Sequence, residues 1–324
     1  MSPSQDPPSS YRVDSTLLYV LLSELRRGPV AARHIGAGER YLPFADPTQV
    51  LTVPGPLFST LCMQVYDSWG PQRMCRVLTD AWVRQWTPVS ALFATARDAV
   101  EVCRRLRSLE RLFARTCVSE FSVLGDNSVS VRRVLQRDIA LTDSHSVAYW
   151  SYVVSAFKAA GCESIRLESP QRCVIHGEQV NPEALSDLSS EPCMRVSWEG
   201  RKRRPAEFVP RLRVPSHANL VSDVVALLDA SLVTGNRVSL AQAANVFHQS
   251  TRTLQRRLQE ANVSLGQTRL ALQLFKTTCL LAESRTDLTH IASVTGFTDA
   301  SHLIHRFQQA TKMTPREFQR VLLH

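Results

Sequence analysis

The chain has 324 residues, of which 44% are apolar and 21% are charged, enough for about two globular domains. With 12 Gly, 17 Pro and a mean hydropathy of −0.12, the composition excludes collagen-like, low-complexity and multi-span membrane proteins. The net charge of +9 falls entirely in the last 124 residues, since residues 1–200 hold 21 basic and 21 acidic side chains. This distribution indicates a polyanionic partner for the C-terminal part alone, and a merely solvated basic surface is the alternative.

An apolar stripe near the start predicts a first helix that Asp14 or Ser15 caps and Gly28-Pro29 ends. Its apolar run, Leu17–Leu22, is far shorter than the roughly 20 residues of a membrane span. No basic segment or small-residue cleavage site flanks this run, so we expect no secretory signal and a cytoplasmic protein.

The rest of the first 200 residues mixes helical and strand patterns, which predicts one α+β domain over residues 1–200. Helices are expected at 98–115 and at 146–160, the second closed by Gly161. Strand patterns at 117–124 and 129–135, joined by Gly125-Asp126-Asn127, predict a hairpin. Further short strands are expected at 164–167, 172–175 and 194–198.

A basic and proline-containing segment follows and predicts a linker at 201–217. It begins with Arg201-Lys202-Arg203-Arg204 and continues with Pro205, Pro210 and Pro215, a composition typical of a stiff, exposed connector. The basic run either touches DNA phosphates or faces solvent.

Residues 218–324 predict an all-α domain. Its first helix covers about 220–232, and a short helix capped by Ser239 runs to Val246. The three residues Phe247-His248-Gln249 then form a tight turn before a helix at 251–260 that Ser250 caps. Two short helices joined in this way are typical of a helix-turn-helix.

The same layout recurs 49 residues later, which indicates a duplicated unit. The shift superposes Ala243 on Ala292, Leu254 on Leu303 and Leu258 on Phe307. In the second unit Asp287 caps a helix to Thr295, Gly296 supplies a left-handed turn residue, and Thr298 or Asp299 caps a helix at 300–310.

A longer helix at about 265–283 joins the two predicted units and spans roughly 27 Å at 1.5 Å per residue. Two recognition helices held near its ends suit successive major-groove segments, which lie about 34 Å apart on one face of a duplex. A last helix, with Thr314 as cap, Pro315 at its first position and Glu317 reaching back, ends near residue 323.

The exposed face of the helix at 251–260 carries the candidate base-reading residues. Leu254 and Leu258 are four residues apart and are expected in the core, which leaves the opposite face to Arg252, Gln255 and Arg256. Arginine pairs bidentately with guanine and glutamine with adenine. Ser250, Thr251 and Arg257 are better placed for phosphates; an ordinary polar helix face is the alternative for the whole set.

The second unit predicts a poorer reading face. Leu303 and Phe307 mark its core, so Ala300, Ser301, Ile304 and His305 are expected toward the groove, the first and third against thymine methyl groups. Thr298 and Arg306 are its phosphate candidates. The alternative is that this unit binds mainly through backbone contacts and adds little specificity.

Residues 219–324 resemble the DNA-binding domain of the AraC/XylS family of bacterial transcription regulators. The resemblance rests on the segment from Ser250 to Leu258, on Ile291-Ala292 with Gly296-Phe297, and on Met313-Thr314-Pro315. It implies two helix-turn-helix units on adjacent major grooves near promoters, and contact with RNA polymerase, usually as an activator.

Three positions depart from the family pattern. His248 stands where the family commonly has Gly, which is tolerable because His is enriched at positive φ. Lys312 replaces the usual Gly before Met313, and His305 occupies a position that is often Arg. The last change puts base contact by the second unit in question.

Residues 40–200 resemble, less closely, the arabinose-binding-like effector domain of one AraC branch, through the segment 95–100, the hairpin and the helix at 146–161. That resemblance implies a small-molecule sensor or a homodimerisation domain and names no effector-binding residue. Six aromatic residues are expected to pack the core, with the lining of a pocket as the alternative: Trp69, Trp82, Trp86, Tyr149, Trp150 and Tyr152.

No catalytic site, metal site or cofactor is expected. Ser155 and Lys158 match the S-x-x-K spacing of a serine nucleophile, but no S-D-N or K-T-G partner accompanies them. His302 and His305 lack a third metal ligand nearby. The eight Cys residues lack a C-x-x-C pair and are expected to be reduced and mostly buried.

The sequence therefore predicts a DNA-binding transcription regulator that responds to a small molecule through its N-terminal domain. A constitutive, architectural DNA-binding protein whose first 200 residues only dimerise is the alternative, and an enzyme fused to a DNA-binding module is a third reading.

Overall fold

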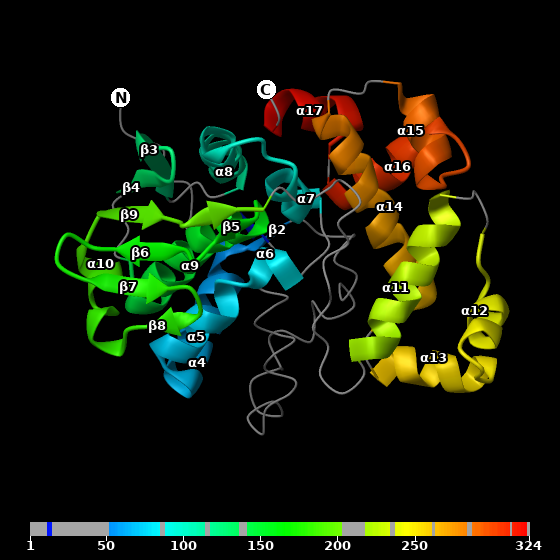
Figure 1. Ribbon diagram of the computed structural model, residues 1–324, viewed down its shortest axis with the longest axis horizontal. Helices are drawn as coiled ribbons and strands as arrows, with labels where there is room; N and C mark the ends of the chain where they lie inside the picture. The colour runs from blue at the N-terminus through cyan, green and yellow to red at the C-terminus, as the bar shows by residue number, and fades with distance from the viewer. Residues whose placement is uncertain are drawn as a thin grey trace. The chain divides into compact units, whose positions relative to one another are not determined.

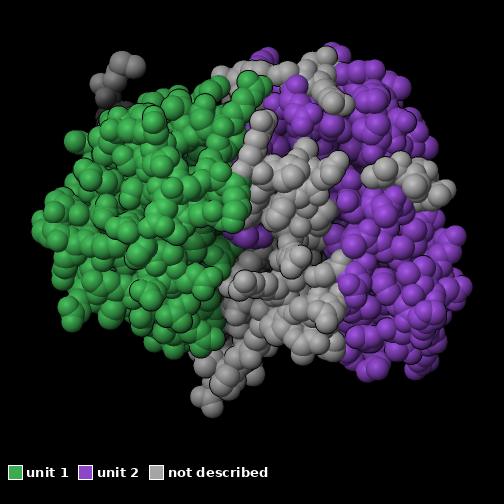
Figure 2. Space-filling view, viewed as in Figure 1, with its two compact units in different colours: residues 1–43, 52–82, 96–203 green, residues 44–51, 83–95, 204–324 purple. Residues whose placement is uncertain are grey.

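The computed structural model describes residues 12–14, 52–84, 88–113, 117–135, 141–202, 218–233, 237–260, 263–283, 287–311 and 313–322. The expected first helix near residues 15–28 and nearly all of the expected linker lie outside these ranges. The chain forms two compact units (Figure 2). Unit 1 holds residues 52–82 and 96–203 together with 1–43, and unit 2 holds 83–95 and 204–324 together with 44–51.

Unit 1 is an α+β fold built on a six-stranded antiparallel sheet (Figure 1). The strand order is β3-β4-β9-β6-β7-β8. The strands are β3 (Cys117–Gly125), β4 (Ser128–Leu135), β9 (Cys193–Ser197), β6 (Arg166–Glu168), β7 (Cys173–His176) and β8 (Gln179–Val180). Two small antiparallel pairs join β1 (Arg12–Asp14) to β2 (Thr52–Pro54) and β5 (Cys162–Glu163) to β10 (Gly200–Arg201).

The helices of unit 1 include three elements that the sequence analysis did not predict: α4 (Gly55–Trp69), α5 (Pro71–Leu78) and α6 (Ala81–Arg84), at which the chain passes into unit 2. The expected helices are confirmed as α8 (Ala99–Phe113) and α9 (Asp143–Ala159). The latter begins three residues earlier than predicted, because Thr142 caps it through the amide of His145. Two short helices, η3 (Pro182–Ala184) and α10 (Asp187–Ser190), complete the unit.

The core of unit 1 lies between the sheet and α9. Val129, Val131 and Val196 are fully buried on the strands, and Trp150 and Phe157 are fully buried on the helix. Alternate residues of the central strands face the other way and are more exposed, as expected for an antiparallel sheet covered on one face. The expected hairpin is confirmed as β3 and β4, with a two-residue turn at 126–127.

Unit 2 is helical. After α7 (Pro88–Ala94) it consists of α11 (Ala218–Val233), α12 (Leu240–Val246), α13 (Thr251–Glu260), α14 (Leu265–Ala282), α15 (Leu288–Thr295), α16 (Ala300–Thr311) and α17 (Pro315–Leu322). The helices from α11 onward confirm the expected series to within a few residues. In Figure 1 the pair α12–α13 and the pair α15–α16 lie toward opposite ends of α14.

α14 is the central helix of unit 2. It contacts α7, α11, α15 and α17, and ten of its side chains are buried. A first apolar cluster joins α11, α12 and α13 to Leu272 of α14. At the far end, Phe307 and Phe318 meet edge to face at 5.1 Å, and Gln319 Nε2 donates to the Leu281 carbonyl at 2.8 Å. No helix among the described residues is long and apolar enough to cross a membrane.

Candidate nucleic-acid interface

In the helix pair α12–α13, hydrogen bonds stabilise both ends of α12. Ser239 Oγ accepts from the amide of Gln242 at 3.2 Å, and Gln242 Oε1 accepts from the amide of Ser239 at 2.7 Å, a capping box. After α12 the amide of Gln249 donates to the Ala244 carbonyl at 2.9 Å, with His248 at φ 51°. The expectation that His248 takes a positive φ is thus confirmed.

α13 has one buried face and one exposed face. Leu254 and Leu258 are 0% and 2% exposed and pack in the cluster with α11 and α12. Arg252, Gln255 and Arg256 are exposed, as the spacing predicts. The structure confirms the phase of this helix; the base-reading role of its exposed residues stays a prediction.

Arg256 is paired on the exposed face with a residue that the sequence analysis missed. Its Nη1 lies 2.8 Å from Glu260 Oε1, and both side chains are solvent-accessible. The i, i+4 spacing of the two residues was the available signal. Glu260 places a negative charge beside the candidate reading residues.

Two of the candidate phosphate contacts of the first pair, Ser250 and Thr251, lie at the start of α13, and the third, Arg257, lies in its last turn. Ser250 Oγ accepts from the amide of Thr253 at 3.1 Å, so Ser250 caps the helix as predicted. Ser250 and Thr251 are exposed, and Arg257 is half-buried. A helix N-terminus with exposed hydroxyl groups favours an anion.

The pair α15–α16 has a similar construction. Asp287 Oδ1 accepts from the amides of Thr289 and His290 at 2.9 and 3.2 Å, which caps α15. Gly296 is left-handed at φ 75°, as predicted. Of the two expected caps of α16, Asp299 is the one that acts, accepting from the His302 amide at 2.7 Å.

α16 also divides into two faces. Leu303 and Phe307 are fully buried, as predicted. Among the candidate reading residues, Ser301 and His305 are exposed, whereas Ala300 and Ile304 are half-buried. The candidate phosphate contacts Thr298 and Arg306 are exposed, and Arg306 donates to Gln309 Oε1 at 3.2 Å.

The two pairs agree in their cores and differ in their turns. The residues matched by the 49-residue shift are buried in both pairs: Ala243 and Ala292, Leu254 and Leu303, Leu258 and Phe307. The left-handed residue is His248 in the first pair and Gly296 in the second, one position earlier after the shift. Both turns have three residues between the end of the first helix and the cap of the second, so the pairs differ in where the left-handed residue stands and not in turn length.

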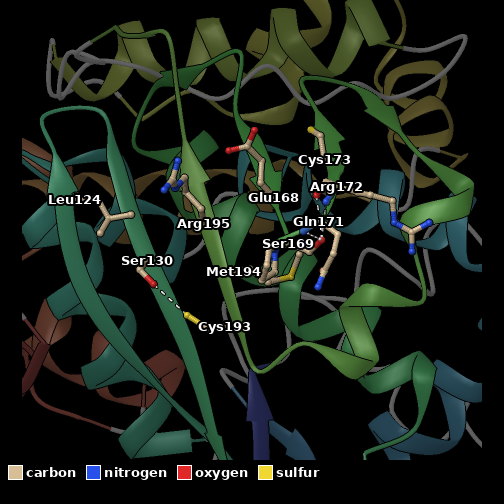
Figure 3. A pocket seen from close by; sticks show the side chains of 11 residues that line it. Leu124, Ser130, Glu168, Ser169, Gln171, Arg172, Cys173, Cys193, Met194 and Arg195 are labelled. Atoms are coloured by element: carbon tan, nitrogen blue, oxygen red, sulfur yellow. Dashed lines mark hydrogen bonds between the residues drawn. The ribbon is translucent and has the colours of Figure 1, made fainter.

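Unit 1 carries a groove of about 600 Å³ on the face of the sheet that points away from the core (Figure 3). Arg195 of β9 lies in register between Ser130 of β4 and Glu168 of β6. At one side of the groove Cys193 Sγ is 3.1 Å from Ser130 Oγ. At the other side Arg172 forms an ion pair of 2.6 Å with Asp187. The groove thus combines charges of both signs with hydroxyl and thiol groups.

A buried polar network links α8, β3 and α9 of unit 1. Glu110, 2% exposed, accepts from the amide and the hydroxyl group of Ser119, each at 2.6 Å. Ser119 Oγ is also 2.6 Å from the hydroxyl of Tyr149. Burial raises the pKa of Glu110 to about 7, although the hydrogen bonds from Ser119 oppose the rise. Glu110 follows Leu106 by four residues on an apolar stripe, a signal that the sequence analysis did not use.

The structure shows which of the candidate aromatic residues are buried and which groups Ser155 and Lys158 of the S-x-x-K pattern contact. Trp82 and Trp150 are buried in the core, and Trp86 lies outside the described residues. Ser155 is fully buried and its Oγ accepts from the amide of Trp82 at 2.9 Å, whereas Lys158 pairs with Asp80 at 2.9 Å. Ser155 thus serves as a hydrogen-bond acceptor inside the core.

The remaining chemistry-bearing side chains form no cluster in the parts of the chain that the structure covers. Within those parts no group of three His, Cys, Asp or Glu side chains is arranged to hold a metal ion. Six cysteines are buried, and Cys173 and Cys193 are half-buried, so the expectation of mostly buried thiols is confirmed.

Comparison with known proteins bears on the C-terminal part of the chain. Residues 243–321 match the family model described as a helix-turn-helix domain. Comparison with curated proteins gives no match. Two solved structures are distantly similar. ToxT from Vibrio cholerae O395 aligns over 67% of this chain and 66% of its own, with 13% identity and a TM-score of 0.32. The transcriptional regulator CdpR from Pseudomonas aeruginosa aligns over 94% of this chain and 98% of its own, with 15% identity and a TM-score of 0.28.

The C-terminal part of unit 2 is thus a helix-turn-helix domain, the class of module that binds DNA. The match agrees with the helix-turn-helix motifs that the sequence predicts; the narrower AraC type rests on the sequence resemblance and stays a prediction. The match begins at Ala243, so the resemblance of residues 40–200 to an effector domain stays a prediction.

Proposed function

We propose that the chain is a sequence-specific transcription regulator whose α13 enters the major groove of DNA. The observation that carries the proposal is the division of α13: Leu254 and Leu258 anchor it in the core, which leaves Arg252, Gln255 and Arg256 on the exposed face. Their side chains have the hydrogen-bonding groups that distinguish guanine and adenine in that groove.

The proposal extends to the second pair. α14 has 18 residues and therefore a length of roughly 27 Å, so α13 and α16 suit adjacent major-groove segments on one face of a duplex. Ser301 and His305 would supply polar contacts and Ala300 and Ile304 apolar ones. Because the last two are half-buried, we expect the second segment to be read less stringently than the first.

Selection from a random pool of duplexes by the full-length chain tests this proposal. We expect enrichment of a motif with two segments whose centres are about 10–10.5 base pairs apart, the first more strongly specified. Failure to enrich any motif at moderate ionic strength would reject sequence-specific reading, because nonspecific binding rests on phosphate contacts alone.

We further propose that unit 1 senses a small molecule and that the regulator acts as an activator in the cytoplasm. The groove beside Arg195 and Glu168 supports the sensing role. The resemblance to the AraC/XylS family supports contact with RNA polymerase and formation of a homodimer. A ligand present at 100 times its dissociation constant adds about 2.7 kcal/mol of stability, so thermal-shift screening of the full chain identifies it. If a broad metabolite collection gives no shift, the effector-independent alternative is favoured.

A further inference from the structure

One helix of unit 2 comes from a distant part of the sequence. α7 is formed by residues 88–94. It belongs to unit 2, which consists of residues 204–324 together with the shorter segments 83–95 and 44–51. Six of its seven residues, Pro88 to Phe93, are buried. A helix buried on all sides is a core element and not a surface connector.

The residues that α7 covers lie on α14 and α11. Ala91, fully buried, packs in one cluster with Val225 of α11 and with Phe275 and Cys279 of α14. The helix contact between α7 and α14 is the most extensive that α14 makes. The small side chain of Ala91 lets the two helices approach closely.

α14 is therefore completed by α7. Phe275 and Cys279 are four residues apart and face α7, whereas Leu272 belongs to the cluster with α12 and α13. Gln273 reaches the turn between α15 and α16. Because both helix pairs pack on α14, loss of α7 would expose apolar surface on the helix that holds them together.

The chain on either side of α7 is fixed within unit 1. The amide of Trp82 is hydrogen-bonded to Ser155 Oγ at 2.9 Å. After α7, Ala96 is buried, and the Arg201 guanidinium donates to the carbonyls of Ala96 and Arg97. Since one residue spans at most about 3.6 Å, the single residue between Ala94 and Ala96 leaves little slack. A rearrangement of unit 1 that moves Ala96 must therefore pull on α7.

We propose that α7 is the link through which unit 1 controls DNA binding: seated on α11 and α14 it completes the DNA-binding unit, and withdrawn it weakens that unit. The part of this inference that concerns DNA rests on the proposed function. The part that concerns the seating of α7 does not.

The buried Cys279 thiol reports directly on the seating of α7. We would label the full-length chain with N-ethylmaleimide and follow each cysteine by peptide mass spectrometry. Ala91→Glu places a charge against Phe275 and Cys279. Ala226→Glu makes the same change at an exposed position of α11 and is the matched control. Cys62 and Cys75, buried in unit 1, serve as internal references.

We expect Ala91→Glu to raise the labelling rate of Cys279 at least tenfold, with Cys62 and Cys75 unchanged and with Ala226→Glu like the wild type. We also expect Ala91→Glu to bind a mixed-sequence duplex at low ionic strength at least tenfold more weakly than Ala226→Glu does. If Ala91→Glu does not fold, Ala91→Leu, which only overpacks the contact, is expected to show the same two changes at smaller size.

Unchanged labelling of Cys279 in a folded Ala91 variant would overturn the seating of α7. Faster labelling with unchanged duplex affinity would overturn the control of DNA binding. If the wild-type chain binds no duplex, the proposed function fails, and the control of DNA binding fails with it. The labelling result still decides the seating, because it requires no DNA.

Discussion

The side-chain amide of Gln273 donates a hydrogen bond of 2.7 Å to the carbonyl oxygen of Gly296, which ties the middle of α14 to the turn before α16. Gly296 is left-handed at φ 75°, and a Cβ atom there would lie 2.5 Å from Leu232 Cδ2 of α11. The turn is thus held on two sides by buried residues of neighbouring helices. This junction holds the turn between α15 and α16 against α11 and α14.

Replacement of Gly296 by alanine tests the junction. We expect Gly296→Ala to lower the free energy of unfolding by at least about 2 kcal/mol, because it combines a left-handed backbone with a contact against buried Leu232. Gly266→Ala on α14, where a Cβ meets nothing within 4 Å, is the control and should be neutral or stabilising by up to about 1 kcal/mol. Urea unfolding measures both, and equal effects would contradict the account.

Arg257 is expected to contact phosphate without reading sequence. Arg257→Ala should weaken binding to all duplexes alike and reduce the slope of log affinity against log salt concentration by about one unit. Arg132→Ala, which removes an exposed charge from β4 of unit 1, is the control and should leave the slope unchanged. A loss confined to one sequence would instead assign Arg257 to base reading.

Glu260 is expected to restrain DNA binding. Glu260→Gln removes a carboxylate from the reading face and frees Arg256 from an exposed ion pair. We expect tighter binding to every duplex by roughly 0.3–1 kcal/mol, with the free energy of unfolding changed by less than about 0.5 kcal/mol. Glu178→Gln, at an exposed position of unit 1, is the matched control. Weaker binding by Glu260→Gln would show that Glu260 instead holds Arg256 in its reading position.

The buried Glu110 predicts a specific pH dependence of stability. Burial raises the pKa of Glu110 from 4.5 to about 7, so its protonated form is favoured in the folded chain. The stability that this proton provides is complete below pH 4.5 and is lost as the pH rises through 7, by up to about 3 kcal/mol. Glu110→Gln remains neutral and should keep that stability.

Unfolding free energies of Glu110→Gln and the wild type, measured from pH 4.5 to pH 8, should therefore diverge in favour of the variant as the pH rises. Glu120→Gln, at an exposed position of β3, is the control and should follow the wild type. A difference between Glu110→Gln and the wild type that stays constant with pH would contradict the burial of an ionisable carboxyl group.

Amphipathic helices and tight turns were predictable from the sequence. α8, α13 and α16 each expose one polar face, so the spacing of Leu254 and Leu258 alone fixed which residues of α13 are exposed. The caps Ser250, Asp287 and Thr314 are local signals read from adjacent residues. The hairpin turn at 126–127 is of the same kind.

The helices between residues 55 and 94 were missed for a physical reason. α7, with the sequence PVSALFA, is buried on all sides and shows no polar face, and Pro88 at its start reads as a turn signal. Its packing on α14 joins residues almost 200 positions apart, which no local pattern indicates. A fragment that begins near residue 217 lacks this helix, so tests of DNA binding require the full chain.

The central claim is that Arg256 reads one base pair from the exposed face of α13. The most direct test is a double-mutant cycle with the full-length chain, in which the wild type and Arg256→Ala bind the selected duplex and each of its single-base-pair variants. We expect Arg256→Ala to cost about 1–3 kcal/mol on the selected duplex and to abolish the penalty at one base pair only. Equal losses on all duplexes, or unchanged penalties at every position, would contradict the claim.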